Sequence, residues 1–343
     1  MTLHRTSAVA KKKVSVVTPG QLCFGFFALF CLLLILRNSD IAIEYMSRGL
    51  LLCAKTVVPS LFPFMILSEL IVSGGIGSVL PKRLLAPLRR LLGLPDAGCC
   101  AVLLGMLCGF PVGAKCALLS YEQGRLSKEE TERVLTFSNN PSSAFLISAV
   151  GVSLWGNRRF GVALYATVLT VSLLTGILAG LLRKKDAEES SASEIQAVVT
   201  PPLTGAKLFT ESVKSATGSM LLVCAYVIFF SALMGTLNIV LSVFDLPHTV
   251  NAFLFCLFEL SGGVSQASAL GNTTVAALLC AFAAGWSGLS VHCQVLSVCD
   301  GKGFSFRPYF LAKLFQGILC ALLFGILLKL FPTLMIPAEI CAR

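Results

Sequence analysis

The sequence predicts an all-α polytopic membrane protein built from two inverted structural repeats with broken or re-entrant helical hairpins. Of the 343 residues, 56% are apolar and only 13% are charged, and the mean hydropathy is +0.85. Soluble domains carry about 25% charged residues. The charged residues also cluster, and they leave long uncharged runs that glycine, proline or amide residues interrupt.

The net charge of +10 does not indicate a nucleic-acid partner, because the basic residues lie in short clusters beside apolar runs. This is the pattern of the positive-inside rule. Basic residues in 1–20 precede an apolar run over 22–36, which Arg37 closes. Because no small-residue cleavage site follows, we expect an uncleaved first span, a cytoplasmic N-terminus and a first segment over 1–40.

The first repeat is predicted over 41–185. Residues 41–55 mix charged and apolar side chains, which favours an interfacial amphipathic helix. Residues 56–81 are apolar apart from Glu69, and their prolines predict a kinked span with a glycine-broken end. A basic loop over 82–90 is expected in the cytoplasm.

A break is predicted at Gly109–Lys115, in the middle of an apolar run. Residues 97–114 carry no charge, yet two glycines flank Pro111 there. Broken backbone in lipid is tolerated where protein buries it or where it lines a wet cavity, and such breaks mark transporter binding sites. The alternative is a proline kink in an ordinary packed span.

Residues 138–143, which contain two asparagines and a proline, predict a second break. Ser127 and Glu130 form a capping-box pattern just before it. The run over 160–182 is uncharged and closes on three basic residues, so we expect a full span with its end in the cytoplasm.

A polar segment over 186–204 is interpreted as a cytoplasmic linker to a second repeat over 205–343. Residues 216–244 are uncharged, and so are residues 260–299, a run too long for one span. A glycine-aromatic break is predicted at 285–288 within that run. The final span is expected at about 309–331, with Lys313 and Lys329 near its ends.

The two halves predict opposite directions for corresponding elements. With both termini inside, 56–81 would run inward and 216–244 outward, as in transporters with inverted repeats. Four basic residues would then lie outside, against the charge rule: Arg158, Arg159, Lys302 and Arg307.

Four motifs in this order resemble the nucleoside-recognition (Gate) domain family of sporulation integral membrane proteins. They are Gly109-Phe-Pro-Val-Gly-Ala-Lys115, Ser138-Asn-Asn-Pro-Ser142, Glu259-Leu-Ser-Gly-Gly263 and Gly288-Leu-Ser-Val-His292-Cys-Gln294. The resemblance covers nearly the whole chain beyond the first span. It implies a membrane protein of endospore-forming bacteria that is needed for the spore cortex. The Gate name reflects similarity to part of concentrative nucleoside transporters and does not identify the ligand.

The candidate substrate-binding residues come from these motifs: Gly109, Pro111, Gly113, Lys115, Asn139, Asn140, Glu259, Gly288, His292 and Gln294. We expect the six polar ones to meet in one cavity between the repeats, because polar groups at membrane depth need partners. Half-helix ends beside them would suit anionic or polar ligands.

Each candidate has a structural alternative. Glu259, like Glu69, is functional by default if it lies at membrane depth, but either could lie at the interface. Lys115 could meet a carboxylate or an anionic ligand, or reach the headgroups. His292 could relay protons or pack as a hydrogen-bonded core residue. Asn139 and Asn140 could contact a polar solute or cap a broken helix.

The expected function is that of a carrier or channel for a solute or a lipid-linked precursor, in a forespore-enclosing membrane. The alternative is a non-transporting scaffold for spore-envelope assembly. No GxSxG, HExxH or P-loop motif is present, so we expect no enzyme and no cofactor. The fourteen cysteines lack metal-site spacing, so we expect no metal. The expected partners are the bilayer and the solute, and the oligomeric state is not predicted.

Overall fold

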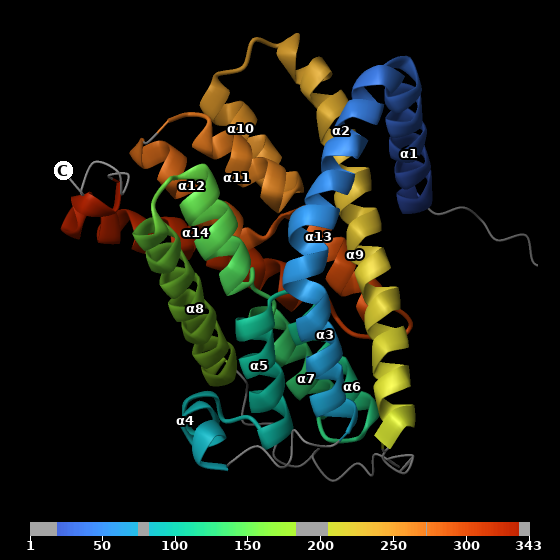
Figure 1. Ribbon diagram of the computed structural model, residues 1–343, viewed down its shortest axis with the longest axis vertical. Helices are drawn as coiled ribbons and strands as arrows, with labels where there is room; N and C mark the ends of the chain where they lie inside the picture. Colours follow the sequence, from blue (N-terminus) through green and yellow to red (C-terminus); the bar gives the residue numbers. More distant parts are fainter. Residues whose placement is uncertain (1–18, 75–81, 183–204, 272, 336–343) are drawn as a thin grey trace, which may run out of the picture.

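The computed structural model describes residues 19–74, 82–182, 205–271 and 273–335, in which helices are joined by short loops and there is no strand (Figure 1). By length and composition, five helices are able to cross a membrane, or up to seven if each of two bent pairs counts as one span. The chain is therefore a polytopic membrane protein. The linker over 186–204, the basic N-terminal tail and the glycines at 75–77 lie outside the described residues.

The first helices form a peripheral span and one long bent rod. Helix α1 (Pro19–Arg37) is followed by α2 (Ser39–Leu52), which continues through a π-helical segment, η1 (Cys53–Val57), into α3 (Val58–Ser73). The rod bends by 55°. The sequence predicts that residues 41–55 form an interfacial helix of their own. In the structure they are helical, but they form the first part of this rod, which packs along α9.

The predicted break at 109–113 is present. Helix α5 (Asp96–Cys108) ends before Gly109, and α6 (Val112–Glu122) begins after Pro111, which follows a cis peptide bond. A short basic helix, α4 (Lys82–Leu92), precedes α5 at an angle of 106°.

The second break is also present, between α7 (Lys128–Ser138) and the π-helical η3 (Ala144–Leu154). The predicted capping box starts α7, because the Ser127 hydroxyl accepts the Glu130 N–H and Glu130 accepts the Ser127 N–H. Helix α8 (Arg158–Leu181) is the full span that the uncharged run predicts.

The second half is also built of long and broken helices. A long helix is followed by two broken pairs and a final long helix: α9 (Gly205–Ser242), α10 (His248–Phe258), α11 (Leu260–Ser268), α12 (Thr274–Trp286), α13 (Gly288–Val298) and α14 (Arg307–Leu330). A short η5 (Pro332–Met335) ends the described chain. The predicted break at 285–288 lies between α12 and α13.

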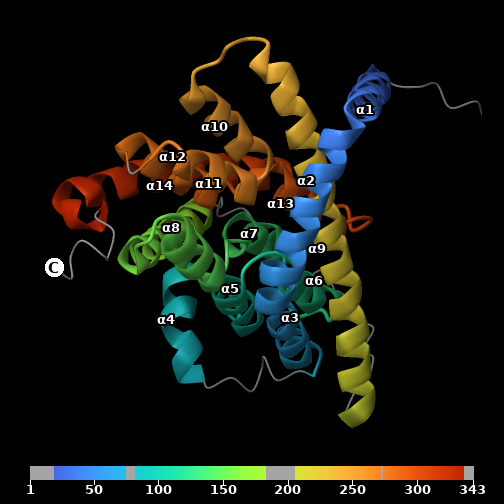
Figure 2. The same cartoon turned by 45° about the horizontal axis from the view of Figure 1, so that its top comes forward.

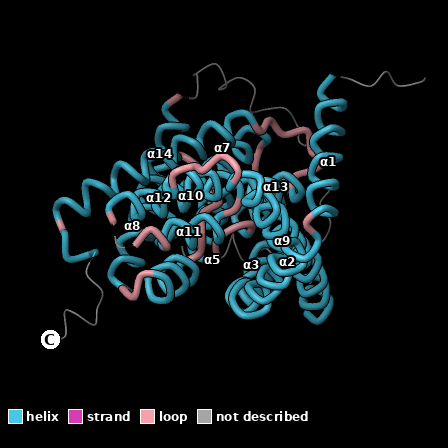
Figure 3. The backbone as a smooth tube through the Cα atoms, turned by 90° about the horizontal axis from the view of Figure 1, so that it is seen from above, coloured by secondary structure: helices cyan, strands magenta, loops and turns pink. Residues whose placement is uncertain are grey.

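The helices pack in two groups around the breaks. The α2–α3 rod and α9 lie side by side and run in opposite directions (Figure 1). On the other side, α14 lies across the direction of α9 and packs against α12 and α8 (Figure 2). Seen from above, α5 and α11 lie between these two groups, while α1 stands at the edge (Figure 3). The broken ends thus meet in the interior.

Candidate functional site

The two breaks of the first half, at 109–111 and 139–143, are in direct backbone contact. Gly109 has a φ of 86°, and an added Cβ would come within 2.7 Å of the Ser142 backbone nitrogen. The Phe110 N–H donates to the Asn140 carbonyl oxygen at 2.9 Å. Glycine is required here both by its backbone conformation and by this close approach.

The second half has a matching contact. Gly288 has a φ of 81°, and a Cβ there would lie 3.0 Å from the Leu260 backbone nitrogen. The break between α12 and α13 therefore rests against the break between α10 and α11. In each half, a glycine of one break touches the backbone of the other.

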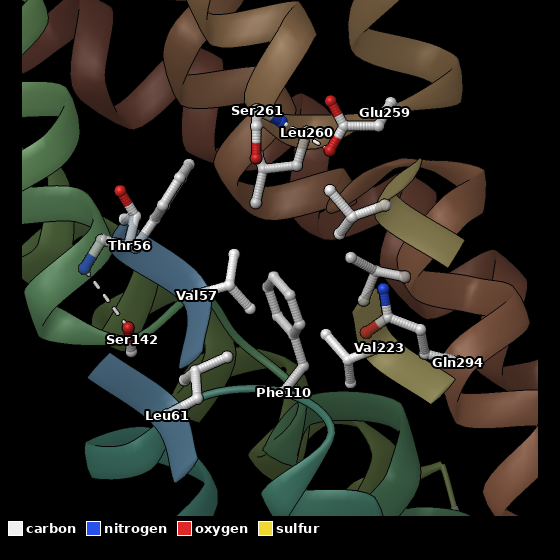
Figure 4. A pocket seen from close by; sticks show the side chains of 13 residues that line it. Thr56, Val57, Leu61, Phe110, Ser142, Val223, Glu259, Leu260, Ser261 and Gln294 are labelled. Carbon is white, nitrogen blue, oxygen red and sulfur yellow. Dashed lines mark hydrogen bonds between the residues drawn. The ribbon is translucent and has the colours of Figure 1, made fainter. Parts of the chain in front are cut away.

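A small cavity of about 40 Å³ lies where breaks of the two halves meet (Figure 4). Space of this size holds a few water molecules. Thr56 and Ser142 lie on one side of it, Glu259, Ser261 and Gln294 lie on the other, and the Phe110 ring projects between them. The rest of the wall is aliphatic or aromatic. We call this space the inner cavity.

A larger space of about 410 Å³, the outer cavity, lies between α2, η3, α9 and α11. Four residues line both cavities: Thr56, Phe145, Glu259 and Ser261. Thr56 belongs to η1 and Phe145 to η3, so both π-helical segments meet the boundary between the cavities. Such segments often occur at functional sites.

Glu259 lies at this boundary and also caps a helix. Its carboxylate accepts the N–H groups of Ser261, at 2.9 Å, and Gly262, at the N-terminus of α11. The side chain is buried. The free N–H groups and the helix dipole offset its negative charge. Glu259 therefore stabilises the start of α11 and also lines the cavity.

Gln294 is the other predicted residue that lines the inner cavity. It is 2% exposed, and its carboxamide points into the space (Figure 4). Its Oε1 has no hydrogen-bond partner among the described residues. A buried amide oxygen without a partner is costly, so this atom is suited to a ligand or a water molecule.

Lys115 lies outside the cavity and meets a carboxylate. Its Nζ lies 2.6 Å from Glu69 Oε2 and donates to Ser219 Oγ at 2.8 Å. The pair ties α6 to α3 and α9. Both side chains are largely buried, so each charge has its partner inside the protein.

Asn139 and Asn140 cap broken helix ends. The Ala114 N–H, at the N-terminus of α6, donates to Asn139 Oδ1 at 2.8 Å. The Asn140 amide donates to the Phe137 carbonyl at 2.9 Å and to Ser172 Oγ at 3.0 Å. The capping alternative is therefore the one that the structure supports for both residues.

His292 packs among aromatic rings. Its Nδ1 lies 2.9 Å from the Tyr309 hydroxyl oxygen, and its ring meets Trp286, Tyr309 and Phe310 edge-on. The six polar candidates consequently do not share one cavity, and the prediction that they do is wrong. Glu259 and Gln294 line the inner cavity, while the other four make contacts between helices.

Two residues of α14 were not among the predicted set. Lys313 and Gln316 are both buried and reach the end of α7. Their spacing with Tyr309, at i, i+4 and i+7, places three polar groups on one face of an apolar helix. That periodicity is readable in the sequence and could have identified them.

Within the described residues there is no group of three or more His, Cys, Asp and Glu side chains able to hold a metal ion. The chemistry available at the inner cavity is hydrogen bonding by hydroxyl, amide and capped carboxylate groups.

The chain is similar to the sporulation integral membrane protein YlbJ of Bacillus subtilis (strain 168). The two are 27% identical over an alignment 339 positions long, and this alignment covers 90% of this chain and 83% of YlbJ. No protein-family model and no solved structure matches the chain. The similarity supports the resemblance to sporulation membrane proteins, whereas membership of the Gate domain family stays a prediction.

Proposed function

We propose that the chain is a transporter-like sporulation membrane protein that carries or conducts a small polar solute, or the polar part of a lipid-linked precursor, between its two halves. The observation that carries this proposal is the inner cavity, where broken helices from both halves meet around the free amide oxygen of Gln294. Broken helices around a central site are typical of transporters.

The buried charges favour an uncharged solute. Glu69 is paired with Lys115, and Glu259 is bound by the N-terminus of α11. The N-terminus of α6, which the sequence suggests for an anion, is capped by Asn139. What remains open toward the inner cavity is neutral, so we expect a ligand rich in hydroxyl or amide groups.

The proposal includes inverted repeats and a role in the spore cortex. Each half contains a long helix, two broken pairs and a final long helix, and the α2–α3 rod runs opposite to α9. The similarity to YlbJ, a sporulation integral membrane protein, supports a role in sporulation, and we propose a location in a forespore-enclosing membrane. We propose a carrier without catalytic activity.

A solute-binding screen on the purified protein tests this function. Gln294→Leu is expected to weaken binding of any captured solute about tenfold to a hundredfold, because a hydrogen bond to a buried partner is lost. Gln123→Leu, at the end of α6 and away from both cavities, is the matched control. Binding that is unchanged in Gln294→Leu would overturn the proposed site.

The second candidate function is a non-transporting scaffold. It is favoured by the use of Lys115, Asn139, Asn140 and His292 in contacts between helices. In that case Gln294→Leu would leave heat-resistant spore formation intact, whereas breaking the Glu69–Lys115 pair would abolish it. A carrier requires that both changes impair sporulation.

A further inference from the structure

The buried face of α14 carries a cation with an unusual set of partners. Lys313 is completely buried, and its Nζ donates to the backbone carbonyl of Asn139 and to Gln316 Oε1 at 3.1 Å. Gln316 in turn donates from Nε2 to the Thr136 carbonyl at 2.8 Å. Among the described residues, no carboxylate lies within 4 Å of the Lys313 amine.

One partner of Lys313, the Asn139 carbonyl, lies at the broken end of α7. The last carbonyls of a helix have no partner within the helix and carry a partial negative charge. At this end, side chains meet most of them: Asn139 bonds to the Leu135 carbonyl, Asn140 to Phe137, and Gln316 to Thr136. Lys313 supplies the only full positive charge in the set.

An ammonium group in this place is costly unless it is compensated. If the only role of Lys313 were to join two helices, a neutral hydrogen-bond donor would do so with a smaller desolvation cost. The broken end of α7 therefore has the character of a cation site, in which the Asn139 carbonyl oxygen and Gln316 Oε1 both accept from one ammonium group.

In secondary transporters, the C-terminal ends of broken helices and unwound carbonyls hold the coupling cation. We propose that the amine of Lys313 is a tethered cation that takes the place of a free monovalent cation at the end of α7. One consequence of this inference rests on the proposed carrier function: solute movement would not depend on sodium at this site.

The structure provides a reason for a covalently tethered cation here. The Asn139 carbonyl accepts from Lys313, and the Asn139 side chain caps α6. Lys313 thus fixes the residue that holds the first break in place. If a free cation dissociated, the Asn139 carbonyl would lose its partner and both breaks of the first half could move. A tethered cation keeps this contact and therefore the positions of both breaks.

Thermal unfolding of the purified full-length protein, in sodium, ammonium or choline chloride at equal ionic strength, tests the proposal. For the wild type we expect the same midpoint in all three salts. Lys313→Ala is expected to unfold several degrees lower, and to recover part of that loss in ammonium or sodium but not in choline, because the small cations fill the vacated space. Lys313→Met fills the space with an apolar chain and should show the loss without recovery.

Lys329→Ala, at the exposed end of the same helix, is the matched control and should change neither midpoint nor salt response. A folded Lys313→Ala without cation-specific recovery would overturn the proposal. If Lys313→Ala does not fold, Lys313→Gln decides: a midpoint equal to that of the wild type would show that a neutral donor suffices and would overturn it, whereas a clear loss supports it. These measurements need no transport, so they stand apart from the proposed function.

Discussion

At the scale of single residues, two of the three buried charged side chains in the described part of the chain have a partner that is distant in sequence. Glu69 finds Lys115, and Lys313 finds the carbonyl of Asn139. Only Glu259 is compensated locally, by the N–H groups two and three residues along the chain. An unpartnered charge in this interior would be costly, so these contacts restrict which helices can lie side by side.

The Glu69–Lys115 pair gives a prediction about stability. Lys115→Met is expected to destabilise the protein by about 3–5 kcal/mol, because it leaves the Glu69 carboxylate buried without a partner. Adding Glu69→Gln should recover most of that loss. Chemical denaturation of the two single variants and the double variant measures the coupling.

The exposed Glu44–Arg48 pair is the control for this cycle, and its coupling should stay within about 1 kcal/mol. Equal losses from Lys115→Met in the presence and absence of the Glu69 carboxylate would contradict the pairing.

The residue types at the breaks were predictable, but their partners were not. Two asparagines in an apolar run indicate unsatisfied backbone nearby, and the sequence leaves open whether they cap or bind. The choice depends on Ala114, which is 25 positions away from Asn139. Likewise, the sequence shows Lys313 only as a lysine near the end of a span. Its buried position becomes evident only when α14 is packed against α7.

At the scale of elements, glycines set the distance between the broken helices. An added Cβ at Gly113 would lie 2.4 Å from the Ser138 carbonyl oxygen, and one at Gly105 would lie 2.2 Å from the same atom. Contacts this short cannot relax without moving the end of α7. The interface between α5, α6 and α7 therefore tolerates no larger side chain at these positions.

Gly113→Ala is consequently expected to reduce folding itself. We expect a loss of about 1–3 kcal/mol or more, since the backbone of α7 must shift. The same substitution at Gly218 on α9 meets nothing within 4 Å and should be neutral or stabilising by about 0.5–1 kcal/mol. The yield of folded protein and the unfolding midpoint measure both changes. Wild-type stability in Gly113→Ala would show that the three helices pack less closely.

Helix breaks were the elements best predicted from sequence, because glycine and proline act locally. The breaks at 109–111, 139–143 and 287 all lie where these patterns place them. The continuation of α2 into α3 was not predictable, because Lys55 and Thr56 suggest a surface and the packing against α9 overrides that preference. The π-helical form of η1 and η3 has no signal in the residues themselves.

At the scale of the whole molecule, two charged loops far apart in sequence lie together. Lys302 pairs with Glu122, and the Ser305 N–H donates to Glu132 at 2.7 Å. The hydrogen bond and charge of Glu122 raise the pKa of Lys302. The raised pKa means that the contact is formed at neutral pH and is lost only as the pH rises through that value.

Residues 122 and 302 are therefore expected on the same side of the membrane. Single cysteines at these two positions, in a cysteine-depleted background, should react with an impermeant reagent added from the same side. A cysteine at Arg159, at the start of α8, provides a comparison for the charge rule. Labelling of positions 122 and 302 from opposite sides would contradict the packing of these loops.

The cap on α6 has a consequence for how the chain is made. The Ala114 N–H finds its acceptor in Asn139, which leaves the ribosome 25 residues later. Until then, a nascent hairpin of α5 and α6 would bring an unsatisfied donor into hydrocarbon, where such a group costs several kcal/mol. The translocon would thus have to shelter this hairpin until α7 is complete. We therefore expect the segment from α5 to η3 to enter the bilayer as one unit.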